Sequence, residues 1–200
     1  MRSVLIAGLS LVVPLCAETA IVIETEFGAI EALLEDERAP LTVANFLQYV
    51  DAGHYTGGQF FRTVRTKPDN QPKASIKIDV VQARVNPDRE AKAFPPVRLE
   101  RTKDTGLKHV DGALSMPRTT PDSGTSGFSI CIGEQPNMDF GALRNPDGQG
   151  FAVFGRVTSG MEIVRKIHGS PSGPNPTDAV VAMGDQRLTP PIRILSVRRR

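Results

Sequence analysis

The sequence predicts a mainly β protein, a closed antiparallel β-barrel capped by two α-helices. Short apolar segments with strand character recur along the chain, and only two separated stretches have helical spacing. The chain contains 18 Gly and 16 Pro, a composition that favours turns between short strands over long helices. Because the strands do not alternate regularly with helices, a barrel is favoured over a parallel sheet.

Length and composition predict one domain. Two hundred residues, 40% hydrophobic and 23% charged, suffice for a single core. The net charge of +2 is too small to predict nucleic-acid or membrane binding. We therefore expect Arg198, Arg199 and Arg200 to form a solvated tail.

Residues 1–17 are predicted to be a cleaved signal peptide, leaving residues 18–200 as the folded domain. Arg2 precedes an apolar run from Val4 to Val13, and small residues end at Ala17. The run is too short to span a bilayer, so no stable membrane insertion is expected. Lipidation of Cys16 is the alternative to cleavage near Ala17. After cleavage only Cys131 remains, which excludes an internal disulfide.

The first half of the chain is predicted to contain a hairpin, a helix and two strands. Residues 19–35 alternate on either side of Phe27 and Gly28, which predicts the hairpin. Apolar residues at helical intervals predict a helix over 39–53, with Pro40 near its start. Strands are expected at 57–65 and, after a proline-interrupted segment, at 76–82.

The second half repeats the pattern. Strands are expected at 112–116, 126–132, 150–157 and 192–197, and the second helix at 159–168. Residues 145–150, with the sequence NPDGQG, predict a turn and lack the ordered oxygen ligands of a calcium loop.

The strand at 57–65 contains a residue whose charge needs an explanation. Strand alternation would place Phe60, Arg62 and Val64 on one face, with Phe61 on the other. A permanent charge beside a phenylalanine indicates either a functional arginine or a structural one held in a salt bridge.

The familiar catalytic motifs are absent from the sequence. His54, His109 and His168 lie far apart, have no metal-ligand spacing, and are expected at the surface or in turns. No nucleophile elbow, phosphate loop or paired-cysteine motif is present, and Cys131 is expected in the core. An enzyme of this sequence would need chemistry without a nucleophile, a metal or a cofactor.

Several segments together resemble the cyclophilin-type peptidyl-prolyl isomerases. They are FFRTV (60–64), GALSMPR (112–118), GTSGFSICI (124–132), MDF (138–140) and GFAVFGRVTSGMEIVRKI (150–167). PDNQP, NPDGQG and LTPPIRI are similar to a bacterial exported branch of that family. The resemblance implies an eight-stranded barrel with two helices, an isomerase of X-Pro bonds, a periplasmic or secreted location, and no cofactor.

The resemblance also implies a site. Arg62 falls on the family's catalytic arginine and Gln82 on the glutamine that binds substrate backbone. Met116 fits the barrel core equally well. The partners implied are proline-containing segments of unfolded or partly folded proteins, bound by a monomer. The implied substrate-binding residues are Phe60, Val80, Met116, Pro117, Arg118, Gly127, Ser129, Asn137, Met138 and Phe151.

The sequence departs from the family pattern at several positions. Phe61 replaces a usual histidine, Ala83 and Arg84 replace two glycines, and Pro117 replaces an alanine. Ser129 stands where a phenylalanine usually walls the proline pocket, a loss of roughly 1.5–3 kcal/mol of apolar contact if the ring were fully buried. Two functions follow: an isomerase that assists folding of exported proteins, or a catalytically weak peptide-binding module of the same fold.

Overall fold

The computed structural model describes residues 18–173 and 185–200. The expected signal peptide at 1–17, with Cys16, lies outside these residues. The strands are β1 Ala20–Thr25, β2 Gly28–Leu34, β3 Gln59–Val64, β4 Val80–Arg84, β5 Ala113–Met116, β6 Phe128–Cys131, β7 Ala152–Ser159, β8 Ser172–Gly173 and β9 Arg187–Arg199.

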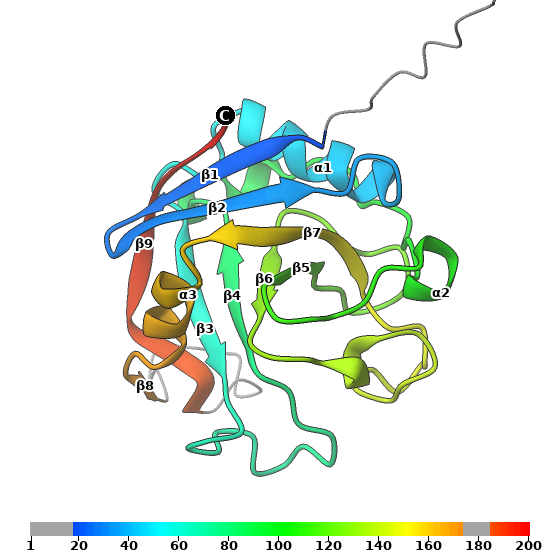
Figure 1. The fold of residues 1–200 in the computed structure, drawn as a ribbon. Coiled ribbons are helices and arrows are strands. Elements are labelled where there is room, and N and C mark those ends of the chain that lie inside the picture. The colour runs from blue at the N-terminus through cyan, green and yellow to red at the C-terminus, as the bar shows by residue number, and fades with distance from the viewer. Residues whose placement is uncertain (1–17, 174–184) are drawn as a thin grey trace, which may run out of the picture.

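Eight of these strands form a closed antiparallel barrel. Their order around it is β1-β2-β7-β5-β6-β4-β3-β9, and β9 pairs with β1 to close the sheet. The two-residue β8 adds to the edge of β9. Figure 1 shows the first and last strands side by side although they lie at opposite ends of the chain. The predicted fold class is confirmed.

The carboxyl terminus is part of the barrel, so the expected solvated tail was wrong. Arg198 and Arg199 lie opposite Val22 and Ile21 in the β1–β9 ladder. Each of the last three arginines also reaches a carboxylate. The pairs are Arg198 with Glu24, Arg199 with Asp51, and Arg200 with Glu31. Ladder pairing orders the residues that local sequence character alone predicts to be exposed coil.

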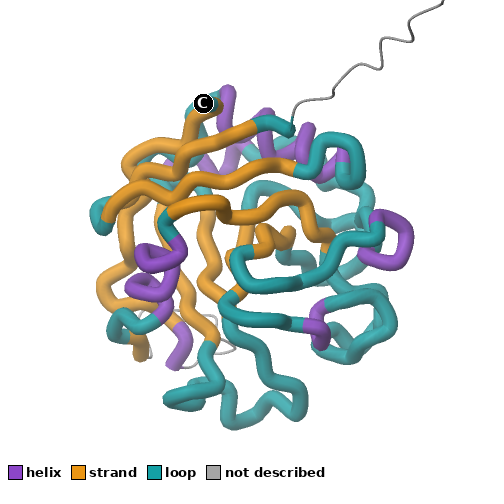
Figure 2. The backbone as a smooth tube through the Cα atoms, in the orientation of Figure 1, coloured by secondary structure: helices purple, strands orange, loops and turns teal. Residues whose placement is uncertain are grey.

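The two predicted helices are present outside the strands. They are α1 Pro40–Asp51, which packs against β7 and β9, and α3 Met161–His168, which packs against β2, β3 and β4. Figure 2 shows that the helical segments occupy the periphery. Shorter helical turns that the sequence did not predict are η1 Pro87–Lys92, α2 Thr102–Thr105 and η2 Pro136–Met138.

Aromatic rings fill the barrel interior. Phe128 lies edge-on to Phe46 and Phe60, with ring centroids 5.7 and 5.8 Å apart, and Phe154 lies 5.2 Å from Phe46. All four side chains are fully buried. Because the interior is packed in this way, a substrate has to bind on the outer surface of the barrel.

Glu100 caps the amino terminus of α1 from a distant segment. Ala39 precedes the helix and has no side chain that can accept a hydrogen bond. The Glu100 carboxylate instead accepts bonds from the Leu41 and Thr42 amides, at 3.0 and 2.8 Å, and from the Thr42 hydroxyl at 2.6 Å. A carboxylate at this position satisfies unpaired amides and complements the helix dipole.

Glu100→Ala should lower the free energy of unfolding by about 1–2 kcal/mol, because it removes the hydrogen bonds to the first amides of α1 and the favourable interaction with the helix dipole. Urea denaturation measures the change. Glu37→Ala is the matched control, since Glu37 is exposed and has no side-chain partner in the described part of the chain. Equal losses in the two variants would contradict the capping role.

Candidate active site

A β-bulge in β3 positions the candidate catalytic arginine. Phe60 pairs with Ala83 and Arg62 pairs with Gln82, so Phe61 is an extra residue on its strand. Since Ala83 and Gln82 are adjacent on β4, their partners Phe60 and Arg62 point to opposite faces. Simple alternation, which placed Phe60 and Arg62 on one face, was wrong. Phe60 enters the core and Arg62 faces outward.

Polar side chains from four neighbouring strands form a row on this outer face. Arg62 pairs with Gln82, Gln82 with Ser129, and Ser129 with Ser115. All four residues line an open cavity of about 580 Å³, hereafter the groove. Its volume is in the range of small-molecule and peptide pockets. The row therefore brings together the two residues predicted to be catalytic.

Most residues predicted to bind substrate line the groove, and three do not. Phe60 is fully buried against Phe128. Asn137 is exposed in η2, outside the groove lining. The predicted residues that do line the groove are Arg62, Val80, Gln82, Pro117, Arg118, Gly127, Ser129, Met138 and Phe151.

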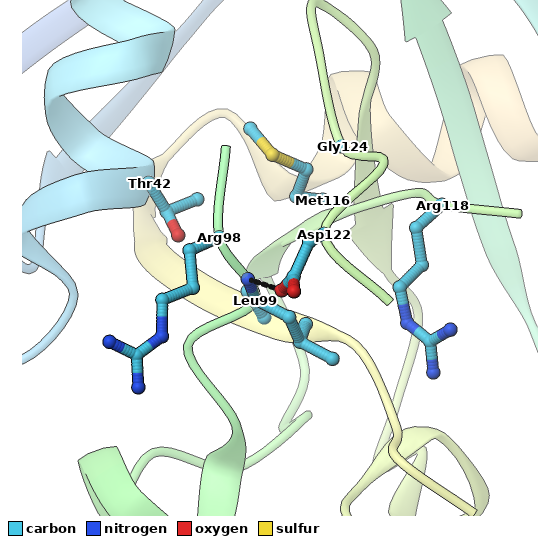
Figure 3. Close-up of a pocket in the computed structure, with 8 residues that line it drawn as sticks. Thr42, Arg98, Leu99, Met116, Arg118, Asp122 and Gly124 are labelled. Atoms are coloured by element: carbon cyan, nitrogen blue, oxygen red, sulfur yellow. Dashed lines mark hydrogen bonds between the residues drawn. The ribbon is translucent and has the colours of Figure 1, made fainter. Parts of the chain in front are cut away.

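Met116 is the third exception and belongs to the barrel interior. It follows Ser115 on β5, so its side chain points away from the groove. Figure 3 shows Met116 beside Gly124 in a separate small pocket of about 10 Å³, where the Leu99 amide donates to Asp122 at 2.8 Å. A Cβ added at Gly124 would lie 2.7 Å from the Met116 sulfur, so this packing is tight. Of the two interpretations of Met116, the core one is correct.

Two glutamines hold the Arg62 guanidinium. Nε and Nη2 donate to Gln186 Oε1 at 2.9 and 2.6 Å, and Nη1 donates to Gln82 Oε1 at 3.1 Å. Arg62 forms no ion pair within the described residues, so the structural salt bridge considered above is not found there. These bonds use three of the five guanidinium N–H groups. The side chain is fixed while its positive charge stays unneutralised.

Burial changes the acidity of Arg62. Desolvation, with a smaller contribution from the charge of Arg144, lowers the pKa of Arg62 to about 10. The guanidinium still carries its proton at neutral pH. A charged group held beside a partly apolar cavity interacts more strongly with a ligand than it would in water.

Gln186 is a site residue that sequence reasoning missed. It lies 124 positions from Arg62, in no motif. Its amide nitrogen donates to the Asn70 carbonyl at 3.0 Å, which fixes which end of the amide faces Arg62. Asn70 is itself tied to β3 through the Thr63 carbonyl at 2.9 Å. The segment between β3 and β4 thus supports the arginine from behind.

A buried histidine connects the groove floor to a carboxylate. His109 Nδ1 lies 2.8 Å from Asp139 Oδ1, and His109 Nε2 lies 2.9 Å from Ser115 Oγ. Burial opposes ionisation of Asp139, but the His109 hydrogen bond and nearby positive charges give it a pKa below its usual value. His109 is 2% exposed, so its expected surface position was wrong. These contacts fix Ser115, whereas Ser129 makes no side-chain hydrogen bond with the described residues.

Other candidate chemistry is not supported by the described residues. They contain no group of three or more His, Cys, Asp or Glu side chains that could hold a metal ion. Burial raises the pKa of Cys131 to about 12, so the thiol stays protonated and inert, in agreement with its expected core position. Within residues 18–173 and 185–200 no helix has the length and apolar character needed to cross a membrane.

Comparison with known proteins gives matches over most of the chain. A family model described as cyclophilin type peptidyl-prolyl cis-trans isomerase/CLD matches residues 20–199. Peptidyl-prolyl cis-trans isomerase A of Dickeya dadantii (strain 3937) is 36% identical over 151 residues, which cover 74% of this chain and 70% of that protein. A peptidyl-prolyl cis-trans isomerase of Acinetobacter baylyi is 29% identical over 197 residues, or 98% of this chain and 93% of that protein.

Solved structures share the barrel. The cyclophilin type peptidyl-prolyl cis-trans isomerase of Cryptosporidium parvum, determined in the presence of the dipeptide Ala-Pro, superposes with a TM-score of 0.66. The match covers 90% of this chain and 98% of that one, at 18% sequence identity. At this low sequence identity, the structural similarity establishes that the two proteins share a fold.

Proposed function

This chain belongs to the cyclophilin-type peptidyl-prolyl cis-trans isomerases and catalyses isomerisation of X-Pro bonds; on that premise we propose that Arg62 drives the reaction during the folding of exported proteins. One observation carries the proposal. The Arg62 guanidinium faces the groove beside Gln82 and is held by neutral partners rather than by a carboxylate.

Arg62 would act on the twisted amide. Rotation about an X-Pro bond has a barrier of roughly 18–20 kcal/mol, because the amide loses its resonance. In the twisted state the nitrogen recovers a lone pair, to which the two remaining N–H groups of Arg62 can donate. A donor that stabilises the twisted state more than either planar isomer accelerates the reaction without transferring a proton.

Gln82 would fix the substrate backbone. Its Oε1 accepts from Arg62, which orients the amide and leaves the Nε2 donors without a partner among the described residues. Those donors can bind a carbonyl of the substrate. One residue thereby positions both the guanidinium and the peptide.

The proline ring would rest on the apolar part of the groove. Val80, Met138 and Phe151 line it, and the Arg118 guanidinium lies 5.3 Å from the centre of the Phe151 ring. Arg118 donates to Asp147 at 2.7 and 2.8 Å, and these bonds fix the guanidinium over the Phe151 ring. The use of Ala-Pro with the Cryptosporidium parvum protein is consistent with a proline subsite.

A peptide-binding module with weak catalysis is the second candidate function. The observation that favours it is Ser129, whose small side chain lines the groove where the family usually has a phenyl ring. Weaker capture of proline would lower turnover while peptide binding along the groove persisted. Measured turnover on short peptides separates the two functions.

Arg62→Ala should lower kcat/KM by about a hundredfold, a loss typical of removing one preorganised electrostatic donor. A protease-free assay, such as exchange spectroscopy on a short proline peptide, measures the change. The thermal melting curve should remain cooperative.

Arg65→Ala is the matched control, because Arg65 follows β3 directly. Arg65 points away from the groove and bonds the Ser170 carbonyl and Ser172 hydroxyl at 3.3 and 2.7 Å. It should lose stability but keep its catalytic efficiency within a few-fold. A folded Arg62→Ala protein as active as the Arg65→Ala protein would show that Arg62 is structural.

Ser129→Phe should raise catalytic efficiency, mostly at low substrate concentration. The added ring would extend the apolar wall beside Val80 and Met138 and tighten proline binding in all states. Ser129 lines the groove but is only 5% exposed, so the added ring would have to extend into the open volume of the groove. Isomerisation rates over a range of substrate concentrations measure the effect.

Ser129→Ala provides the comparison, since it removes the hydroxyl without adding a ring and should change efficiency little. If Ser129→Phe instead melts lower, by an overpacking cost of roughly 1–3 kcal/mol, and gains no efficiency, the pocket is already complete without this ring.

We also propose that the chain is exported from a bacterial cell, with cleavage near Ala17. The residues just after that point are tied to the barrel, because the Thr19 amide and hydroxyl donate to Asp36 at 2.7 and 2.9 Å. Cleavage there would leave β1, which begins at Ala20, intact. Mass spectrometry of the protein from the extracytoplasmic fraction should give an amino terminus near Glu18, whereas a diacylglyceryl group on Cys16 would indicate a lipid anchor.

A further inference from the structure

The groove contains more positive charge than its proposed chemistry at Arg62 requires. Among the described residues, five arginines line it and one carboxylate, that of Glu90 in the exposed η1 turn, stands against them. Arg118 is neutralised by Asp147. The lining arginines are Arg62, Arg84, Arg118, Arg144 and Arg187.

Arg84 places a second unneutralised charge at one end of the groove. It lies two residues beyond Gln82 on β4, so both side chains project from the same face. Its guanidinium carbon lies 5.1 Å from the centre of the Phe61 ring, and Nη2 donates to Gln59 Oε1 at 3.1 Å. Its Nε is buried without a partner, and no carboxylate pairs with it within the described residues.

Arg144 places a third such charge at the other end. Its Nη1 donates to Gln71 Oε1 at 3.1 Å and also to the Ile76 carbonyl, both in the segment that precedes β4. It has no carboxylate partner among the described residues. Its charge contributes, after burial, to the lowered pKa of Arg62, and both side chains line the groove. Arg84 lies at the carboxyl end of β4, whereas Arg144 is bonded to the segment before the amino end of β4. We infer that the two charges flank Arg62 on both sides.

We propose that the groove selects proline segments flanked by aspartate or glutamate. This inference rests on the proposed function and names its substrate class. Arginine binds carboxylates through paired N–H donors, and a cleft lined by one sign of charge concentrates ligands of the other sign. Along β4, Gln82 and Arg84 are separated by about 7 Å, which is also the distance spanned by two residues of an extended peptide. An acidic side chain two positions from the substrate residue whose carbonyl Gln82 binds would therefore lie within reach of Arg84.

The apolar wall beside the arginines favours a peptide over a nucleic acid. Val80, Met138 and Phe151 add apolar side chains to the groove that the arginines line. A proline with acidic neighbours supplies both apolar and anionic groups in the matching order.

The experiment compares peptides that differ in one charge. Each has a single central proline and carries Glu, Gln or Lys two positions before or two positions after it. Exchange spectroscopy gives kcat/KM, and chemical-shift titration of the protein gives binding of the same peptides. We expect kcat/KM and binding affinity to decrease from the Glu peptide to the Gln peptide to the Lys peptide. The Glu and Lys peptides should differ by about tenfold at low salt, and by less at 0.5 M salt because salt screens the charges.

Two variants locate the selectivity. Each of Arg84→Gln and Arg144→Gln should reduce the ratio of kcat/KM for the Glu peptide to that for the Lys peptide. Each variant should do so only when the charged residue lies on one particular side of the proline. Arg193→Gln is the matched control, since Arg193 is also an arginine on a barrel strand, is largely exposed, and does not line the groove. It should leave the ratio unchanged.

The outcomes separate this inference from the function it rests on. Equal efficiency and equal binding of the Glu, Gln and Lys peptides would overturn acidic selection while leaving isomerase activity intact. Absence of turnover on every peptide would contradict the catalytic proposal, and the binding order would still decide the selectivity. A twelve-nucleotide single-stranded DNA can be tested as a competitor of the bound Glu peptide. If the DNA displaces that peptide at a lower concentration than added Glu peptide does, the arginines of the groove bind nucleic acid instead.

Discussion

The extra residue in β3 is the constraint on which the groove depends. A regular strand would send Phe60 and Arg62 to the same side of the sheet, either burying a charge among the core rings or removing a ring from the core. With Phe61 bulged, the strand pairs Phe60 with Ala83 and Arg62 with Gln82. One short strand thus supplies both a core aromatic and an outward-facing guanidinium. Bulges near functional sites commonly redirect a side chain in this way.

Neutral hydrogen-bond partners keep that guanidinium both fixed and charged. A carboxylate at position 186 would hold Arg62 equally well but would cancel much of its field in the groove. Gln186 and Gln82 accept from Arg62 without adding negative charge, and Asn70 fixes Gln186 in turn. The same pattern holds at Arg84, whose partner is Gln59, and at Arg144, whose partners are Gln71 and a backbone carbonyl. Amides, rather than carboxylates, position the unpaired arginines of this face.

The floor of the groove combines this charge with hydroxyl groups. Ser129 and Ser115 continue the row begun by Arg62 and Gln82, and His109 with Asp139 fixes Ser115 from below. A polar floor and a shorter apolar wall shift the balance of binding from the proline ring toward the flanking residues. The Ser129 departure and the excess of arginine therefore act in the same direction: both make the residues around the proline matter more to recognition.

The sequence by itself determined the fold class, the two main helices and the buried state of Cys131, and its resemblance to a known family named Arg62 and Gln82 as candidates. Periodicity and turn residues are local features, so they can be interpreted without knowledge of the tertiary structure. The tertiary structure alone decided the bulge at Phe61, the core position of Met116, the burial of His109, the ordering of the last three arginines, and the meeting of Arg62 with Gln186. These depend on strand register and on contacts between distant segments, and a one-residue shift in register reverses every face. Local pattern carries no information on that choice, because only closure of the whole barrel fixes which residues lie opposite one another.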